Sequence, residues 1–248
     1  MSDTPAKGGA KALVSDILAA TPAAATTPAA PAPVAAPPVD PDSEAKDLIE
    51  VYFDLEEPDE RDVLFDQLCR LDTPVVTEFL RTMLSHDEDD YVRAEAACEL
   101  CRRGDADGIA ALEADLADPE EPYFFERAVQ ALAEIRGPAF YDTAAALWRD
   151  PERDAEERRE AMLGMETADP ARAVLDFVRF VDSITDIATM PDDQVEVAML
   201  AFVRHAHRDA EPALEALKAR IAKASMDEEE RLELVAFVQE GLDLLAGA

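Results

Sequence analysis

The residues best suited to chemistry in this chain are Cys98 and Cys101, which form a C-x-x-C pair. Such a pair is redox-active at a helix N-terminus, or supplies half of a zinc site when two further ligands stand nearby. Here both cysteines fall late in a predicted helix, where the helix dipole disfavours thiolates. The nearest ligands of suitable type are Cys69 and His86, and no second C-x-x-C exists. We therefore expect small buried packing thiols; a zinc or redox site is the alternative.

The histidines and acidic clusters form no recognisable catalytic motif. His205 and His207 flank one alanine, a spacing that places them about 200° apart on a helix and hence on different faces. A metal site on one helix uses positions i and i+4, so we expect a surface or helix-end role. The chain has no G-x-S-x-G, phosphate-binding glycine loop or H-E-x-x-H. We expect no catalytic residue, no metal site and no cofactor.

The elements that would position any site recur with a period of 32 residues. Asp118-Pro119 and Asp150-Pro151 lie 32 residues apart, and each unit between such breakers contains two predicted helices joined by a turn. A period of this length is typical of stacked helical hairpins, which bury their apolar stripes only against neighbouring units. We predict an all-α fold of about twelve helices, with a fourth unit lengthened over residues 183–191.

The clearest unit, residues 87–118, resembles the HEAT-like repeat family, in particular its short form found in phycobilisome (PBS) lyase-type proteins. Its first helix carries the family's spacing of apolar, basic and small residues, and its second carries spaced aliphatic residues: Val92, Arg93, Ala96 and Leu100, then Ile109, Leu112 and Leu116. The resemblance extends over roughly residues 43–248 and implies an α-solenoid of about five helical-hairpin repeats.

The same resemblance implies a ladder of ionic contacts between adjacent repeats. In the family, an aspartate at the turn pairs with an arginine a few residues later. The matching pairs in this chain are Asp90 (or Asp89) with Arg93, and Asp154 with Arg158. This role is structural. Arg127 is displaced from the equivalent position, which leaves the continuity of the ladder open.

The first 42 residues differ in composition from the rest. Residues 21–42 contain seven prolines among alanines and threonines, which predicts a disordered, extended linker. Residues 1–20 include a short amphipathic helix whose apolar face comprises Leu13, Val14, Ile17 and Leu18. This helix is a possible docking peptide, similar to the peptides that direct cargo into bacterial microcompartments, or an incidental helix in a tail. We expect neither a secretory signal nor a membrane span, hence a cytoplasmic protein.

Charge restricts the classes of partner. The 248 residues carry a formal net charge of −33, which argues against direct nucleic-acid binding, because that requires basic residues to replace counterions. A basic protein partner fits this charge. The alternative is that the acidity only maintains solubility.

Three classes of function stay open. The first is a non-enzymatic scaffold or adaptor for protein–protein interaction, in which acids of the second helices bind a basic partner: Glu78, Glu113, Asp115, Asp142 and Asp176. The second is an accessory subunit of an enzyme, because short HEAT-like repeats resemble phycobilin lyase subunits. The third is an acidic mimic of nucleic acid.

Overall fold

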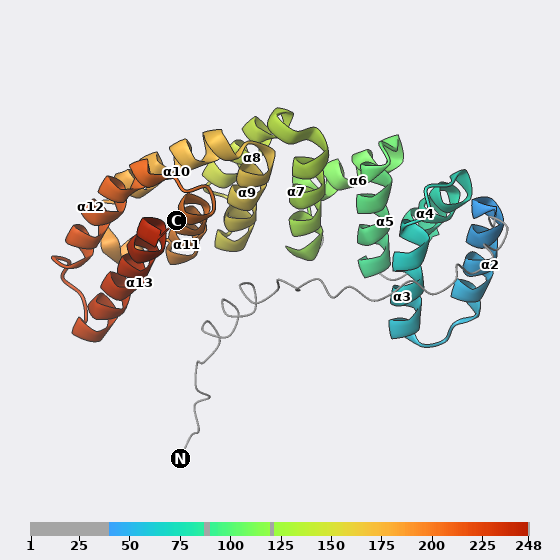
Figure 1. Cartoon of the computed structure of the whole chain (residues 1–248), viewed down its shortest axis with the longest axis horizontal. Coiled ribbons are helices and arrows are strands. Elements are labelled where there is room, and N and C mark those ends of the chain that lie inside the picture. Colours follow the sequence, from blue (N-terminus) through green and yellow to red (C-terminus); the bar gives the residue numbers. More distant parts are fainter. Residues whose placement is uncertain (1–39, 87–89, 120–121, 248) are drawn as a thin grey trace, which may run out of the picture. The chain divides into compact units, whose positions relative to one another are not determined.

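A computed structural model describes residues 40–247 of the chain, except 87–89 and 120–121. The proposed docking peptide and most of the predicted linker lie outside the described residues. The described part contains twelve α-helices, three short 3-10 helices and no strand (Figure 1). The predicted all-α class is therefore confirmed.

The helices follow one another with short connections. Their bounds are α2 (Pro41–Asp54), α3 (Pro58–Cys69), α4 (Pro74–His86), α5 (Asp90–Arg102), α6 (Ala106–Ala117), α7 (Pro122–Arg136), α8 (Tyr141–Arg149), α9 (Ala155–Ala168), α10 (Pro170–Ser183), α11 (Asp192–Arg204), α12 (Glu211–Ile221) and α13 (Glu228–Gly247). The 3-10 helices are η1 (Gly137–Ala139), η2 (Ile187–Thr189) and η3 (Arg208–Ala210). Along the chain, the helices α3 to α12 follow one another as five successive pairs, flanked by α2 and α13.

Aspartates at the breakers start several of these helices. The carboxylate of Asp105 accepts the amide N–H of Asp107, that of Asp154 accepts Glu157, and that of Asp169 accepts Arg172. Each bond satisfies one of the first N–H groups of a helix, which have no partner within the helix. Proline follows directly at Pro170, where its fixed φ suits the first helical position.

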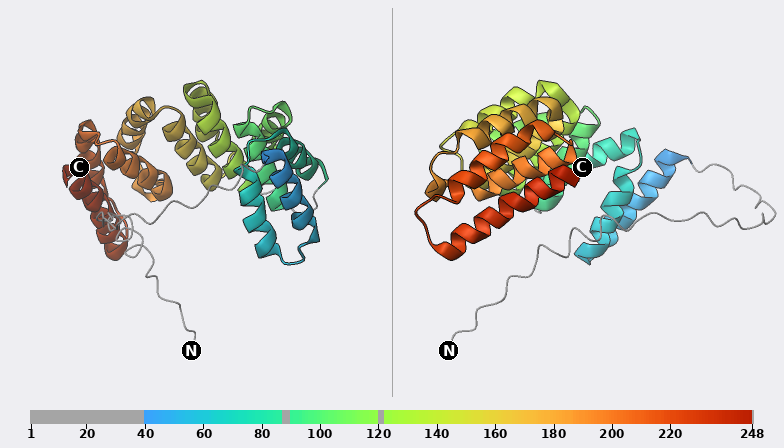
Figure 2. Two further views of the ribbon diagram at one scale, coloured as in Figure 1. Left: turned by 45° about the vertical axis from the view of Figure 1, so that its right-hand side comes forward. Right: turned by 60° about the vertical axis from the view of Figure 1, so that its left-hand side comes forward.

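Successive helices alternate between two layers. In the first layer α5 packs against α7, α7 against α9, α9 against α11, and α11 against α13. In the second layer α4 contacts both α2 and α6, and α10 contacts α12. Figure 2 shows the same alternation from two further sides. Neighbouring hairpins thus cover each other's apolar stripes, as the period of the sequence predicts.

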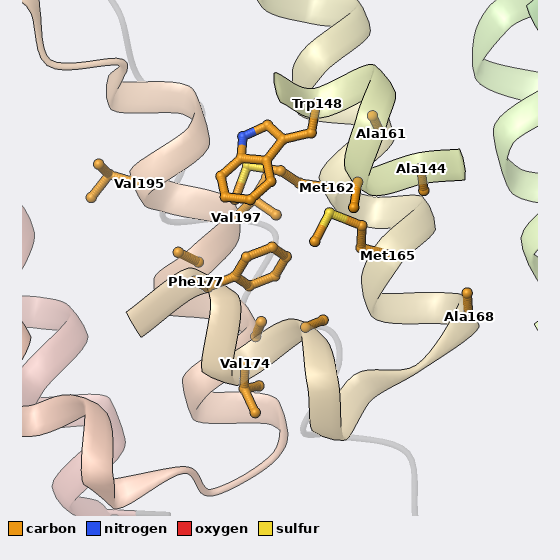
Figure 3. Packing of buried hydrophobic residues seen from close by; sticks show 14 of the residues in the cluster. Ala144, Trp148, Ala161, Met162, Met165, Ala168, Val174, Phe177, Val195 and Val197 are labelled. Atoms are coloured by element: carbon orange, nitrogen blue, oxygen red, sulfur yellow. The ribbon is translucent and has the colours of Figure 1, made fainter. Parts of the chain in front are cut away.

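The core between the layers is filled by aromatic residues, methionines and small alanines. Figure 3 shows Trp148 and Phe177 beside Met162 and Met165. The Trp148 and Phe177 rings meet edge to face with centroids 6.0 Å apart. The indole N–H of Trp148 donates to the buried amide oxygen of Gln194 at 3.0 Å, which satisfies the indole N–H and this oxygen inside the core. This contact joins α8 to α11.

The lengthened unit is also present. Helix α10 ends at Ser183 and α11 begins at Asp192, and the segment between them contains η2. Its apolar residues Ile184, Ile187 and Met190 are buried. The insertion therefore extends the core instead of forming a loop over the surface.

Candidate functional site

The cysteine pair belongs to the core. Cys98 and Cys101 lie in α5 with no exposed surface, which confirms the expectation of buried packing thiols. Burial raises the pKa of Cys98 to about 12 and also raises the pKa of Cys101. Both are therefore thiols at neutral pH, and the thiolate is the form that reacts or binds metal. No cluster of three metal-ligating side chains occurs among the described residues.

The two neighbouring histidines share one cavity. Helix α11 ends at Arg204, and Ala206 has a left-handed φ of 48°. His205 and His207 therefore leave the helix and both line a cavity of about 400 Å³. The expectation that they lie on different faces of one helix is wrong, because the helix stops before either of them. Their expected position at a helix end is confirmed.

Acids of the second-helix layer already contact arginines of the chain. The Arg81 guanidinium lies 3.2 Å from Glu78, Arg136 lies 2.5 Å from Glu113, and Arg172 lies 2.6 Å from Asp142. Arg149 and Arg179 lie 2.9 and 2.8 Å from the two carboxylate oxygens of Asp176.

The most crowded of these contacts joins α8 to α10. The Tyr141 hydroxyl donates to Asp176 at 3.0 Å, and the Arg172 guanidinium lies 4.0 Å from the centroid of the Tyr141 ring. Burial and the Asp176 carboxylate raise the pKa of Tyr141. The acids on this part of the second-helix layer are thus paired with arginines of the same chain. Asp115, the remaining predicted acid, is half-buried in α6.

The two arginines of the predicted ladder, Arg93 and Arg158, make different contacts. Arg158 donates from its Nε to the backbone carbonyl of Asp154 at 3.3 Å, so this contact stays within one helix start. The guanidinium of Arg93 lies 5.9 Å from the ring centroid of Phe124 in α7. The side chain of Asp90 lies outside the described part, and the pairing of Asp90 with Arg93 stays a prediction.

Three other arginines connect adjacent units through backbone carbonyls. Arg103 donates to the carbonyl of Cys69 at 2.9 Å, at the end of α3. Arg153 donates to that of Leu116 at 2.8 Å, near the end of α6, and Arg220 donates to that of Asp182 at 2.9 Å, near the end of α10. The last carbonyls of a helix have no partner within it, so these bonds satisfy them.

A sequence signal for two of these arginines exists. Arg103 lies 3.1 Å from Glu99, and Arg153 lies 3.1 Å from Glu157. In each case the two residues are four positions apart, with the arginine just outside the helix that carries the glutamate: Arg103 follows the end of α5, and Arg153 precedes the start of α9. The glutamate holds one edge of the guanidinium while the other edge reaches the preceding unit.

Acids of another kind lie on α3, α7 and α9, each of which is the first helix of a pair. Asp62 and Asp66 of α3 border a small pocket of about 70 Å³ that Tyr91 and Glu95 of α5 complete. Between α7 and α9, Glu126, Glu156 and Glu160 border a pocket of about 220 Å³ together with Tyr123. We call the set Asp62, Asp66, Glu126, Glu156 and Glu160 the acidic first-helix face.

Most acids of this face have no internal counter-charge. Asp62, Asp66, Glu126 and Glu156 are exposed and form no ion pair with any other described residue. Glu160 pairs with its neighbour Arg159. Burial raises the pKa of Glu160, Arg159 offsets this in part, and the Glu126 and Glu156 carboxylates raise it further. Mutual repulsion among three carboxylates therefore persists at this groove.

Two tyrosines lie beside these acids. The rings of Tyr91 and Tyr123 are stacked, with centroids 5.5 Å apart and planes inclined by 23°. Tyr91 is about half exposed, at 51%, and borders the pocket between α3 and α5, whereas Tyr123 borders the pocket between α7 and α9. A ring face next to carboxylates attracts cations through both the ring quadrupole and the net charge.

Comparison with known proteins places the centre of the chain in a family. Residues 77–166 match the family described as HEAT repeats. This part of the chain consists of HEAT repeats. The matched segment begins within α4 and ends within α9, and it includes the unit in which the sequence pattern is clearest. The alternating layers of these HEAT repeats continue in the helices on both sides. No curated protein and no solved structure matches the chain significantly. HEAT repeats generally serve as scaffolds for protein interaction.

In the described residues no helix is both long and apolar enough to span a membrane.

Proposed function

We propose that the protein is a non-enzymatic scaffold that binds a basic segment of a partner protein on its acidic first-helix face. The observation that carries the proposal is the difference between two sets of acids. Four of the predicted second-helix acids contact arginines of the chain, whereas Asp62, Asp66, Glu126 and Glu156 have no such partner among the described residues. An acid without a counter-charge gains most from an external cation.

The proposed partner carries lysine or arginine in an exposed segment. Its cations lie against the carboxylates of the first-helix pockets, and one of them lies against the exposed part of the Tyr91 side chain. Because the acids are exposed, their attraction is screened by salt. Binding therefore weakens as ionic strength rises. No step of this function requires a cofactor, a metal ion or bond chemistry.

The second-helix acids define a competing surface. The sequence points to Glu78, Glu113, Asp115, Asp142 and Asp176 as the partner-binding residues, and this placement stays a proposal. We favour the first-helix face because a partner on the second helices must compete with arginines already in contact, such as Arg172 at Asp142. Displacing these ion pairs reduces the net gain from each new contact.

A pair of matched variants distinguishes the two surfaces. One variant replaces three first-helix acids (E126Q, E156Q, E160Q), and the other replaces three second-helix acids (E78Q, E113Q, D142N), so both lose the same formal charge. The probe is a fluorescent nine-residue peptide with arginine at every third position, titrated at low salt, with a glutamine-substituted peptide as the control.

The proposal predicts that the first-helix variant lowers the affinity for the arginine peptide about tenfold, the loss that corresponds to 1.4 kcal/mol. The second-helix variant should change the affinity less than about threefold, the effect of net charge alone. Equal losses in both variants, or a larger loss in the second-helix variant, would place the basic segment elsewhere.

A further inference from the structure

The groove between α7 and α9 continues beyond its acidic pocket. A second pocket of about 170 Å³ lies between the same two helices, which pack side by side (Figure 1). Glu126 and Glu160 line both pockets, so the two form one continuous groove. On α9 the groove extends from Glu156 to Thr167, roughly 16 Å at 1.5 Å per residue. This length accommodates about five residues of an extended peptide.

The two ends of this groove differ in polarity. The acidic end contains the carboxylates of Glu126, Glu156 and Glu160. The side chains at the other end carry no charge, and we call this part the uncharged end: Val129, Gln130, Leu163, Gly164 and Thr167. Leu163 is half-buried and packs against the hydrophobic core, so part of its side chain stays open to the groove. A ligand that fills the whole groove therefore needs cations at one end and an apolar group at the other.

Close packing of α9 on α7 forms the floor of the uncharged end. A Cβ atom at Gly164 would clash with the Cγ1 of Val129, so only glycine allows the two helices to approach this closely. Gly164 and Val129 are both buried. Leu163, Gln130 and Thr167 are the more exposed groups at this end, and a ligand in the groove contacts them.

The charges around the groove decide which end receives a cation. At the acidic end, Glu126 and Glu156 form no ion pair with another described residue. At the uncharged end, the Arg127 guanidinium donates to the side-chain oxygen of Gln130 at 3.0 Å. A second cation at this end would lie near Arg127 and be repelled by it. The cations of a bound segment therefore belong at the acidic end, and an uncharged side chain belongs at the other.

We propose that this groove binds a two-part segment of the partner protein, a run of arginine or lysine residues with one aliphatic side chain just outside the run. The inference rests on the function proposed above and adds the apolar requirement. The cations lie at Glu126, Glu156 and Glu160, and the aliphatic side chain lies against Leu163. Leu163 and Thr167 are roughly 5 and 10 Å beyond Glu160 along α9. Two or three extended residues span this distance, so the aliphatic side chain stands two or three positions from the nearest cation.

The test compares four fluorescent peptides that share three arginines, titrated against the full chain. Two carry a leucine three positions outside the arginine run, one at each end; a third carries the same leucine between two arginines, and a fourth carries glutamine instead. At least one end-leucine peptide should bind about tenfold more tightly than the central-leucine peptide. This ratio should persist at high salt, because apolar burial is not screened.

The outcomes separate this inference from the function on which it rests. If the arginine peptides bind but neither end-leucine peptide binds more tightly than the central-leucine peptide, the apolar requirement is overturned and the basic-segment function stands. If none of the four peptides binds, both are contradicted.

Two leucine variants locate the apolar contact. Leu163→Gln places an amide in the groove, and Leu147→Gln makes the same change in α8, at another half-buried leucine that packs against the same core. Leu147 does not line the groove. With both variants folded by circular dichroism, Leu163→Gln should abolish the tenfold advantage of the end-leucine peptide, and Leu147→Gln should retain it. The same advantage in both variants would contradict the assigned site.

Discussion

A guanidinium nitrogen of Arg127 lies 2.5 Å from the carboxylate of Glu95, and this pair joins α7 to α5 across 32 residues of sequence. The Tyr123 hydroxyl donates to the other oxygen of Glu95 at 2.6 Å. Both charged side chains are largely buried, with 18% of Glu95 and 20% of Arg127 exposed. The pair therefore holds two repeats in register, and removal of one partner leaves the other charge poorly solvated.

Arg127→Gln should lower the free energy of unfolding by about 2–3 kcal/mol, measured by urea denaturation. Adding Glu95→Gln should recover part of that loss, because the double variant has no uncompensated charge. Arg136→Gln, which breaks the more exposed pair with Glu113, is the control and should cost less than about 1 kcal/mol. Additive losses from Arg127→Gln and Glu95→Gln would show that the two side chains are not coupled.

Two equivalent helix ends use different residues. Helix α5 closes with Gly104 and α11 closes with Ala206, both with positive φ and the same pair of backbone hydrogen bonds. Ala206→Gly should raise the free energy of unfolding by about 1 kcal/mol, because it removes the strain. Gly104→Ala should lower it by a similar amount; a Cβ at Gly104 meets no atom within 4 Å, so only the backbone conformation is affected. Thermal denaturation checks both, and opposite signs are the required result.

The arginines that cap the preceding unit should matter more than the arginine of the predicted ladder. Arg153→Gln removes the bonds to the carbonyl of Leu116 and to Glu157, and it also removes a cation–π contact with Phe125. We expect a loss of about 1–2 kcal/mol. Arg158→Gln should change stability by less than about 0.5 kcal/mol, because its hydrogen bond to the Asp154 carbonyl stays at the start of α9 and joins no second repeat. If urea denaturation shows a larger loss of stability for Arg158→Gln than for Arg153→Gln, the predicted role of Arg158 in an ionic ladder between repeats would be supported instead.

These comparisons show what could be predicted from the sequence. The 32-residue period and the Asp-Pro breakers predicted the layers, because caps such as Asp169 and buried stripes such as Leu112 to Leu116 are local patterns. Ion pairs such as Arg172 with Asp142 join residues 30 positions apart. Which acid each arginine contacts depends on how the repeats stack, and the composition of the chain does not specify this.

The histidine cavity shows a second limit. The prediction treated residues 205–207 as helical because no glycine marks the end of α11. Alanine in the left-handed conformation gives no such signal, and both histidines border one cavity just after the end of α11. The contacts of Arg103, Arg153 and Arg220 were missed for a similar reason. Every residue has a backbone carbonyl, so the sequence does not show which carbonyl an arginine will reach.

The raised pKa of Glu160 predicts a pH dependence of stability. Its folded-state pKa lies above the unfolded value of about 4.3. At a pH between these two pKa values, the folded state therefore binds more protons than the unfolded state. The contribution of Glu160 is therefore favourable at low pH and is lost as pH rises through the folded pKa. Glu160→Gln should be more stable than the wild type at pH 7 and should lose this advantage below about pH 4.

Glu113→Gln on the second-helix layer controls for the loss of one negative charge. Denaturation midpoints at several pH values, compared between the two variants, check the prediction. A constant difference between Glu160→Gln and the wild type across pH 3–7 would contradict the crowding of carboxylates between α7 and α9.

Affinity capture from the native host, with partners identified by mass spectrometry, tests the acidic first-helix face most directly. The four baits are the full chain, the E126Q/E156Q/E160Q variant, the E78Q/E113Q/D142N variant and a chain that lacks residues 1–20. We predict that one set of basic proteins binds every bait except the first-helix variant, and that salt releases it. Retention of that set by the first-helix variant would contradict the account, and its loss only from the truncated bait would assign recognition to residues 1–20.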